Sequence, residues 1–223
     1  FNLVDGFRRM AGVERTPPSY ALRRPGEAER ARARATLLTA ARAAGENDPA
    51  GFAAFQLGAS NDARRWPTAS FAALGRSLRE RAGLVPVLTG SAGESPLARR
   101  YFAHGGPGLD FTGRTDLPEL AALLTETRLL VTNDTGTMHL AAGLGVPLLA
   151  LFLATAQPWD TGPYAEAQCC LEPRLDCHPC AFGVACPHDR ACRFSITAEA
   201  VAALVLPRLA SGRWQPAPEA TAQ

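Results

Sequence analysis

With 223 residues, 47% of them hydrophobic, the chain is long enough to bury one sizeable α/β core. A formal net charge of +2 with 20% charged residues argues against a nucleic-acid binder and against a disordered chain. No apolar run approaches the roughly 20 residues that span a bilayer, because two glycines and a proline interrupt the longest one, 140–153.

All 23 basic side chains are arginines, in a chain also rich in Ala, Gly and Pro, which indicates a compositional bias. Any anion bound through a basic side chain therefore meets a guanidinium group, whose planar fork suits phosphate. The chain begins at Phe1 without an initiator Met and without the layout of a signal peptide. This start predicts that the sequence is part of a longer protein.

The chain opens with a predicted amphipathic helix over 1–13, a break at 16–19 and an extended stretch over 20–25. The composition of 27–44, rich in Ala, Arg, Leu and Glu, favours a second helix. Four strand–loop–helix units follow. Their strands are predicted at 52–57, 85–88, 109–111 and 129–132, and their helices at 71–82, at 95–102, from an N-cap at Asp116 to 125, and from the Asp134 turn to 144. A fifth strand is predicted at 148–152.

Strands and helices that alternate at this spacing predict an α/β fold, a Rossmann-like parallel sheet with helices on both faces. Ligands of such sheets bind beyond the carboxyl ends of the strands. The loops that follow the first four predicted strands are therefore the candidate functional loops.

The loop after the first predicted strand, 58–67, is a candidate anion-binding loop. It combines a small-residue turn, the hydroxyl of Ser60 and the cations Arg64 and Arg65 at a strand-to-helix junction. Backbone N–H groups, the helix dipole and guanidinium groups act together on an anion at such a junction. The alternative is a surface loop with solvated arginines, in which Trp66 packs against the core.

The loop after the second strand, 90–94, repeats this theme with Gly90, Gly93 and Glu94. The glycines permit close approach of a backbone, and Glu94 could accept hydrogen bonds from a ribose diol. Alternatively, Glu94 favours the positive N-terminus of the following helix.

The stretch 133–139 is the most informative one. A carboxylate, two hydroxyls and a glycine crowd the start of a helix whose remainder is small and apolar, so this first turn faces a site or is capped locally. Asp134 or Thr135 as an ordinary N-cap is the alternative reading. His139 falls one turn after Thr135 on the same helical face, and a lone His there is alternatively a buried core residue.

Three segments match one known family in the right order. They are Gly58-Ala59-Ser60 with Arg64-Arg65-Trp66-Pro67, then Gly90-x3-Glu94, then Asp134-Thr135-Gly136-Thr137-Met138-His139 continuing to Phe152, with Thr161-Gly162-Pro163-Tyr164 beyond. Together they resemble glycosyltransferase family 9, the heptosyltransferases, which add ADP-heptose to the inner core of lipopolysaccharide. The chain contains no catalytic triad, no Walker loop and no G-x-G-x-x-G after a strand.

The resemblance implies a GT-B glycosyltransferase, with two Rossmann-like domains across a cleft, of which this chain is the C-terminal, donor-binding half. It implies an interdomain connection over 1–25, the nucleotide-sugar-binding domain over 26–210 and a flexible tail over 211–223. The catalytic base would lie on the N-terminal domain, so this chain would hold no catalytic residue and turn over little by itself. The reaction implied is inverting transfer without a required cofactor.

The resemblance also assigns roles to residues of this chain. Ser60 and Arg64 would hold the diphosphate, Arg64 standing where the family has Lys. Glu94 would contact the ribose, and Asp134 the donor sugar. The remaining candidate donor-binding residues are Thr135 and Gly136 at the phosphates, His139 in support of that loop, and Thr112, Gly113 and Leu117 beside the base.

The implied partners are an ADP-heptose-type donor and a lipopolysaccharide or related glycan acceptor, with no nucleic acid. The implied location is the cytoplasm, at the inner face of the cytoplasmic membrane through the other domain. One departure from the family is Leu153-Ala154-Thr155 in place of Gly-Pro-Thr, which would narrow the donor pocket. The alternative functions are a non-catalytic nucleotide-sugar-binding module and a zinc-stabilised interaction domain.

All six cysteines lie in a Cys-rich segment, 169–193. Cys177, Cys180, Cys186 and Cys192 could ligate a structural zinc ion, since Cys-x2-Cys is a typical start of a zinc site. Local disulfides or free thiols are an equal alternative, and an iron–sulfur cluster is a third, without typical spacing. In each case the segment is predicted to pin a loop.

Overall fold

The computed structural model describes residues 3–13, 22–165, 167–181 and 183–214, and side chains from Phe7 onward within them. The predicted break at 16–19, residues 20 and 21 of the stretch 20–25 and most of the tail 211–223 lie outside these residues. Within them, no helix is both long and apolar enough to cross a membrane.

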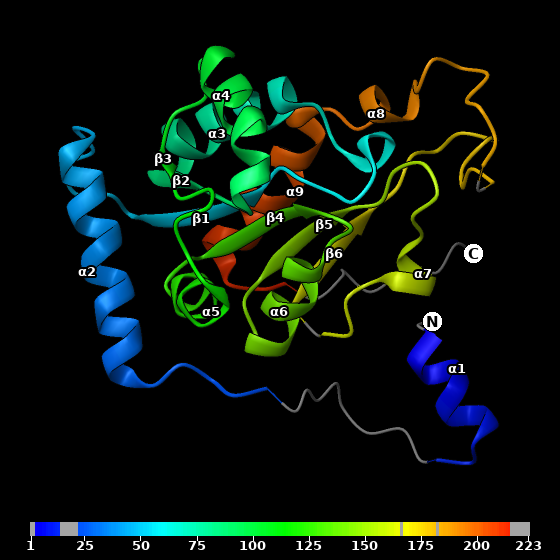
Figure 1. The fold of residues 1–223 in the computed structure, drawn as a ribbon, viewed down its shortest axis with the longest axis horizontal. Helices are drawn as coiled ribbons and strands as arrows, with labels where there is room; N and C mark the ends of the chain where they lie inside the picture. The colour runs from blue at the N-terminus through cyan, green and yellow to red at the C-terminus, as the bar shows by residue number, and fades with distance from the viewer. Residues whose placement is uncertain (1–2, 14–21, 166, 182, 215–223) are drawn as a thin grey trace.

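A parallel sheet of six strands forms the centre of the described chain (Figure 1). The strands are β1 Gly51–Gln56, β2 Leu84–Thr89, β3 Leu109–Asp110, β4 Leu129–Asn133, β5 Leu148–Leu151 and β6 Gln168–Leu171. Their order across the sheet is β3-β2-β1-β4-β5-β6, and every neighbouring pair is parallel. The chain builds outward from β1 in one direction and then from β4 in the other. The point of reversal, where a ligand crevice is expected, therefore lies between β1 and β4.

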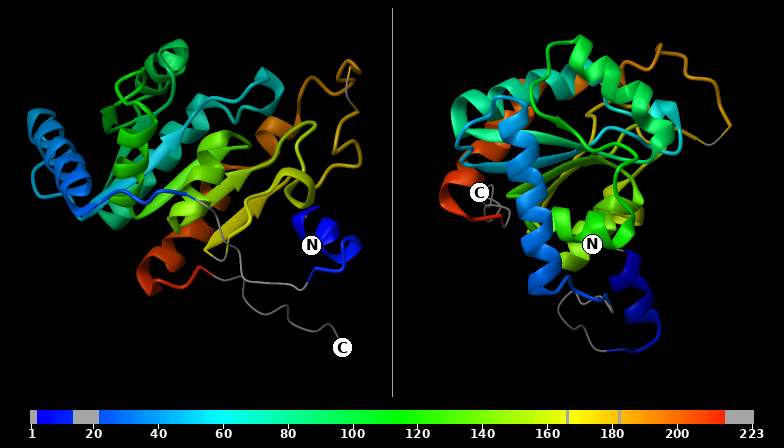
Figure 2. Two further views of the ribbon diagram at one scale, coloured as in Figure 1. Left: turned by 60° about the horizontal axis from the view of Figure 1, so that its bottom comes forward. Right: turned by 60° about the vertical axis from the view of Figure 1, so that its left-hand side comes forward.

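Helices cover both faces of the sheet, as the two views in Figure 2 show. One face carries α3 Thr68–Ala82, α4 Ser95–Ala103 and α9 Ala198–Ser211, and the other carries α2 Glu27–Ala43, α5 Leu117–Thr125 and α6 Gly136–Leu144. Shorter elements are α7 Pro158–Thr161, α8 Cys192–Ser195 and the 3-10 turns η1 Asp62–Arg64 and η2 Ala92–Glu94. The predicted fold class is confirmed.

The four central strands, β1, β2, β4 and β5, bury both of their faces, which explains their nearly continuous apolar sequences. Phe55 of β1 points toward α3 and α4, where its ring lies 5.6 Å from that of Phe71 and 6.2 Å from that of Tyr101. Its neighbour Ala54 faces α5 and α6 on the other side. Alternation along one strand therefore divides the core into two layers.

The elements agree with the sequence-based predictions within a few residues up to β5. The N-cap at Asp116 is confirmed, because its carboxylate accepts a hydrogen bond of 2.8 Å from the Glu119 N–H. Four elements beyond β5 escaped prediction, namely α7, β6, α8 and α9. Of these, β6 contains Cys169 and Cys170, and the N-cap of α9, Thr197, accepts a hydrogen bond from the Ala200 N–H.

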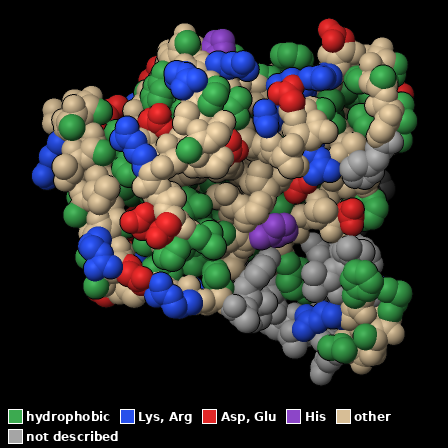
Figure 3. All heavy atoms as spheres, in the orientation of Figure 1, with side chains coloured by type: hydrophobic (Ala, Val, Ile, Leu, Met, Phe, Trp, Pro, Cys, Tyr) green, Lys and Arg blue, Asp and Glu red, His purple; other side chains and the backbone are tan. Residues whose placement is uncertain are grey.

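The helix α1, Leu3–Met10, lies beside α7, and Arg8 donates a hydrogen bond of 3.5 Å to the Tyr164 hydroxyl. Two hydrophobic side chains of this helix face solvent, Phe7 at 59% and Met10 at 76% exposed. Green side chains of the helix are visible at the lower right of Figure 3. Elsewhere on the face in Figure 3, arginines and acidic side chains are interspersed.

Candidate functional site

Four loops at the carboxyl edge of the sheet contact one another in series. The loop after β3 joins the loop after β2, because the Gly113 N–H donates to the Gly90 carbonyl at 2.7 Å. The side chain of Glu94 in the β2 loop accepts a hydrogen bond of 3.1 Å from Gln56, the last residue of β1. The loop after β1 reaches the loop after β4 through Arg64 and Asp134. Three of the four loops thus meet at or beside the point where the strand order reverses.

The pair of Arg64 and Asp134 lies at this point of reversal. Arg64 follows β1 and Asp134 follows β4, and their nitrogen and oxygen atoms are 3.2 Å apart. Arg64 also donates a hydrogen bond of 2.9 Å from Nε to the Thr155 hydroxyl, after β5. The Arg64 side chain is only 19% exposed. The alternative of a solvated Arg64 is therefore wrong, and its guanidinium joins three loops.

Asp134 is a buried carboxylate, with 9% of its side chain exposed. Burial raises the pKa of Asp134 above its ordinary value, although the charge of Arg64 and a hydrogen bond with Thr161 lower it. The α6 N-cap is Thr135, whose side chain makes no capping hydrogen bond and lies 3.1 Å from the Thr132 hydroxyl. The reading of Asp134 as an ordinary helix cap is therefore wrong, because its carboxylate faces Arg64.

A buried amide fixes the loop after β1, 58–67, which we call the donor loop after the role that the family resemblance implies for it. Asn133 is fully buried at the end of β4, and its Nδ2 donates to the Leu57 and Gly58 carbonyls at 2.9 and 3.1 Å. Its Oδ1 accepts the Trp66 N–H at 2.9 Å. One side chain thus holds both ends of the loop and satisfies buried backbone groups.

Trp66 packs in the core, as the sequence suggested. It is 1% exposed, its ring lies 4.9 Å from that of Phe71, and its Nε1 donates to the Ile196 carbonyl at 2.8 Å. The packing of Trp66 is compatible with an anion site in the same loop. The Trp66 side chain points into the core, while the Arg64 side chain points toward Asp134.

In the loop after β2, the carboxylate of Glu94 accepts hydrogen bonds from this loop and from the end of β1. Glu94 accepts hydrogen bonds from the backbone N–H of Ser91 at 2.6 Å and from its hydroxyl at 3.0 Å. The same side chain packs against Gly58, where any Cβ would overlap the carboxylate. Gln56 beneath it also accepts hydrogen bonds from Thr89 and Thr137, at 3.3 and 3.5 Å. Glu94 therefore organises its own turn and the base of the donor loop.

The third loop lies close against the second. Gly113 has φ +71°, and a Cβ there would lie 2.7 Å from the Ala92 Cα, so both the conformation and the contact require glycine. The Thr112 N–H donates to Asp110 at 2.9 Å. Leu117, at the start of α5, is 67% exposed. Their predicted place beside a nucleotide base stays a prediction.

The other predicted site residues lie at the surface of the same edge. Ser60, Gly136 and His139 are exposed, and Thr135 is half-buried. The alternative of His139 as a buried core histidine is wrong, because His139 is exposed. Leu153 is fully buried in the core beneath α3 and α9. The narrowing of a donor pocket by Leu153 remains a prediction.

The six cysteines are free thiols in this structure. Burial raises the pKa of Cys180, and the thiols of Cys192, Cys177 and Cys186 raise it further. Within the described part of the chain, no three His, Cys, Asp or Glu side chains are arranged to hold a metal ion. The present arrangement of the four predicted zinc ligands therefore does not fit a bound ion.

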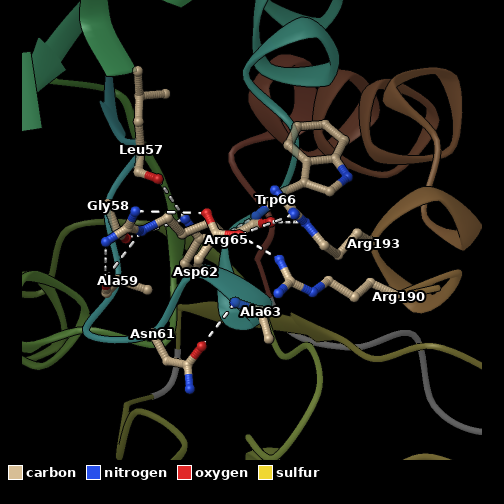
Figure 4. A network of polar contacts seen from close by, with 11 residues as sticks. Leu57, Gly58, Ala59, Asn61, Asp62, Ala63, Arg65, Trp66, Arg190 and Arg193 are labelled. Carbon is tan, nitrogen blue, oxygen red and sulfur yellow. Dashed lines mark hydrogen bonds and ion pairs between the residues drawn. The ribbon is translucent and has the colours of Figure 1, made fainter. Parts of the chain in front are cut away.

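Sequence reasoning missed the groups that hold the loops in place. Gln56, Thr132 and Asn133 are buried polar residues at strand ends, a pattern that could have indicated a framework for the loops. It also missed a second network, on the outer side of the donor loop, in which Arg190 and Arg193 contact Asp62 (Figure 4). These residues lie 128 and 131 positions apart along the chain from Asp62, and no local pattern connects them.

The fold and this edge define a Rossmann-like α/β domain, a class that binds ligands where the strand order reverses. Residues 10–188 match the sequence model of Glycosyltransferase family 9 (heptosyltransferase), and the chain belongs to this family. Lipopolysaccharide heptosyltransferase 1 of Pseudomonas aeruginosa is 38% identical over 117 residues, which are 52% of this chain and 32% of that protein.

Two solved structures share the fold. The glycosyltransferase family 9 protein of Veillonella parvula has a TM-score of 0.72 at 22% identity, over 93% of this chain and 59% of that one. The E. coli heptosyltransferase WaaC, solved with ADP, has a TM-score of 0.57 at 23% identity, over 74% and 47%. The chain thus spans about a third of the curated relative and about half of each solved one. The expectation of a Rossmann-like half of a GT-B fold is confirmed.

Proposed function

We propose that this chain binds the diphosphate of an ADP-heptose-type donor at the carboxyl edge between β1 and β4. The observation that carries the proposal is the Arg64–Asp134 pair, which sets a cation and a carboxylate at the reversal of the strand order. A guanidinium and a helix N-terminus that lie together favour a diphosphate, since each contributes N–H donors and positive potential. The start of α6 at Gly136 adds such an N-terminus.

The proposed reaction is transfer with inversion at the anomeric carbon. An acceptor hydroxyl attacks that carbon while the nucleoside diphosphate leaves, and charge develops on the leaving phosphate. Arg64 and the first N–H groups of α6 would stabilise this charge in place, which is electrostatic preorganisation. Asp134 would hold the donor sugar by accepting hydrogen bonds from its hydroxyls. The proposed step requires no cofactor.

The partners follow from the relatives and belong to the proposal. A related structure was solved with ADP, and a curated relative is named a lipopolysaccharide heptosyltransferase. We propose a lipopolysaccharide or related glycan acceptor and action at the inner face of the cytoplasmic membrane. The catalytic base would come from a further domain, so this chain alone would bind donor and transfer little.

Titration calorimetry with ADP, UDP and GDP tests this proposal. We expect the chain to bind ADP most tightly, and Arg64→Ala to weaken ADP binding about tenfold or more, because charge-assisted hydrogen bonds to phosphate are strong. Arg64→Lys should fall between, since it keeps the charge and loses the fork. Preference for UDP or GDP would remove the ADP assignment. Absence of binding by all three would overturn the donor site, and unchanged affinity in Arg64→Ala would move it elsewhere.

Structural zinc at Cys177, Cys180, Cys186 and Cys192 stays a separate prediction. Zinc would require the four thiolates to close into a tetrahedron with sulfur–zinc distances of about 2.3 Å. Metal analysis of the purified chain tests it, and one equivalent of zinc that is lost in Cys180→Ser would support it. A metal-free chain with six titratable thiols would contradict it.

A further inference from the structure

The outer side of the donor loop is held by a segment that lies far away in the chain. Asp62, in the η1 turn, is half-exposed and contacts three guanidinium groups (Figure 4). Arg190 donates to its Oδ2 at 2.7 Å and Arg193 at 3.3 Å, while Arg65 lies 3.6 Å from Oδ1. Two of these three cations come from the Cys-rich segment.

The same segment also holds the donor-loop backbone. Arg193 Nε donates to the Arg65 carbonyl at 2.9 Å, and its side chain is only 19% exposed. Arg65 in turn donates from Nε and a terminal nitrogen to the Ala59 carbonyl, at 3.1 and 2.9 Å, and so closes the loop across its middle. The Trp66 ring donates to Ile196, directly after α8.

These contacts enclose the peptide that carries Arg64. Arg64 lies between Asp62 and Arg65, which the Cys-rich segment holds from outside, while its side chain crosses to Asp134. Because a guanidinium must meet a diphosphate in a defined orientation, the fixed backbone limits the directions that Arg64 can take.

The arginines are themselves tied to the cysteines of the segment. The Arg190 N–H donates to the Cys186 sulfur at 3.3 Å. Arg193 directly follows Cys192, which is buried at the start of α8. A change in the conformation of this segment would therefore move both contacts to Asp62.

We propose that the Cys-rich segment positions the donor loop, with Arg190 and Arg193 as positioning residues that act through Asp62 and the Arg65 carbonyl. This inference rests on the proposed donor site for its functional meaning. The two arginines face Asp62 and the loop backbone, and they orient Arg64 for the diphosphate.

Hydrogen exchange of the ligand-free chain tests the positioning role without any donor. The reporting amides are Ala63, which donates to Asn61 Oδ1, and Arg65, which donates to the Asp62 carbonyl. We expect Arg193→Ala and Asp62→Asn to speed exchange at both amides. The matched control is Arg76→Ala, which loses two hydrogen bonds to the His104 and Gly105 carbonyls on another loop. Unchanged exchange in Arg193→Ala would overturn the proposal.

ADP titration of the same variants adds a second test, because positioning and simple charge effects change the ADP affinity in opposite directions. Removing the negative charge of Asp62 would strengthen anion binding if charge alone mattered. Positioning predicts instead that Asp62→Asn weakens ADP binding about threefold to tenfold. Arg193→Lys should recover part of the loss seen in Arg193→Ala, and Arg76→Ala should bind like the unmodified chain. Tighter or unchanged binding in Asp62→Asn would overturn the proposal.

A double-mutant cycle separates this contact from general destabilisation. Asp62→Asn with Arg193→Ala should weaken ADP binding by less than the sum of the two single losses, because both changes remove the contact that Asp62 and Arg193 share. Additive losses would contradict action through Asp62. If the unmodified chain binds no ADP while the loop amides still respond, the donor site fails and the positioning of the loop stands.

Discussion

The loops after β1 and β2 both combine glycines with a charged residue, but their charged side chains point to different partners. The donor loop after β1 turns Arg64 outward to Asp134, and its ends are held from beneath by Asn133. The loop after β2 turns Glu94 inward, to Ser91 and Gln56. A charged residue in such a loop can therefore pair with a neighbouring loop, as Arg64 does, or serve its own turn, as Glu94 does.

The largest expected effect is on the framework of the donor loop. Asn133→Ala removes an amide that makes three buried hydrogen bonds, so the Trp66 N–H and two carbonyls lose their partner. We expect the free energy of unfolding to fall by about 2–4 kcal/mol, measured by urea denaturation. A loss below about 1 kcal/mol would show that the loop ends do not depend on this amide.

The second loop gives the sharpest contrast with Arg64. Glu94→Gln replaces the carboxylate that accepts from Ser91 and Gln56, so we expect a loss of about 1–2 kcal/mol in unfolding free energy. ADP affinity should change less than about threefold, well below the effect of Arg64→Ala. The opposite result, unchanged stability with a large loss of affinity, would make Glu94 a ligand contact, as the family resemblance implied.

The smallest effect concerns the pH dependence of Asp134. Because burial raises its pKa, the folded chain holds this proton more tightly than the unfolded chain does. Its contribution to stability is therefore fully present below the unfolded pKa and is lost as pH rises through the folded pKa. Relative to the unmodified chain, Asp134→Asn should gain about 1–3 °C in unfolding temperature between acidic and neutral pH. A difference in unfolding temperature that does not vary with pH would contradict the raised pKa.

The sequence predicted the central units well because their signals are local. Short apolar runs separated by helix-forming segments indicated β1 to β5, and the Asp116 cap was visible within four residues. The strand β6 escaped because Gln168–Leu171 is short and contains Cys169 and Cys170, which fit the pattern of a Cys-rich segment as well as that of a strand. The helix α9 did offer a signal, in Val201, Val205 and Leu209 at spacings of four after Thr197.

The candidate site was partly predictable. Arg64, Glu94 and Asp134 stood out because each is a charged residue in a small-residue loop that directly follows a predicted strand. Their partners were not predictable, since Arg64 and Asp134 lie 70 positions apart and Glu94 and Gln56 lie 38 apart. Pairing at that separation depends on strand order, which the sequence pattern left open.

The sequence by itself determined the fold class, the family and the candidate loops after the strands, because hydrophobic periodicity and short motifs are properties of neighbouring residues. Only the tertiary structure decided that Arg64 faces Asp134, that Glu94 serves its own turn, and that Arg190 and Arg193 hold Asp62. The physical reason is the reversal of strand order between β1 and β4, which brings distant strand ends to one edge. Once there, buried polar atoms must find partners, and geometry rather than sequence distance selects them.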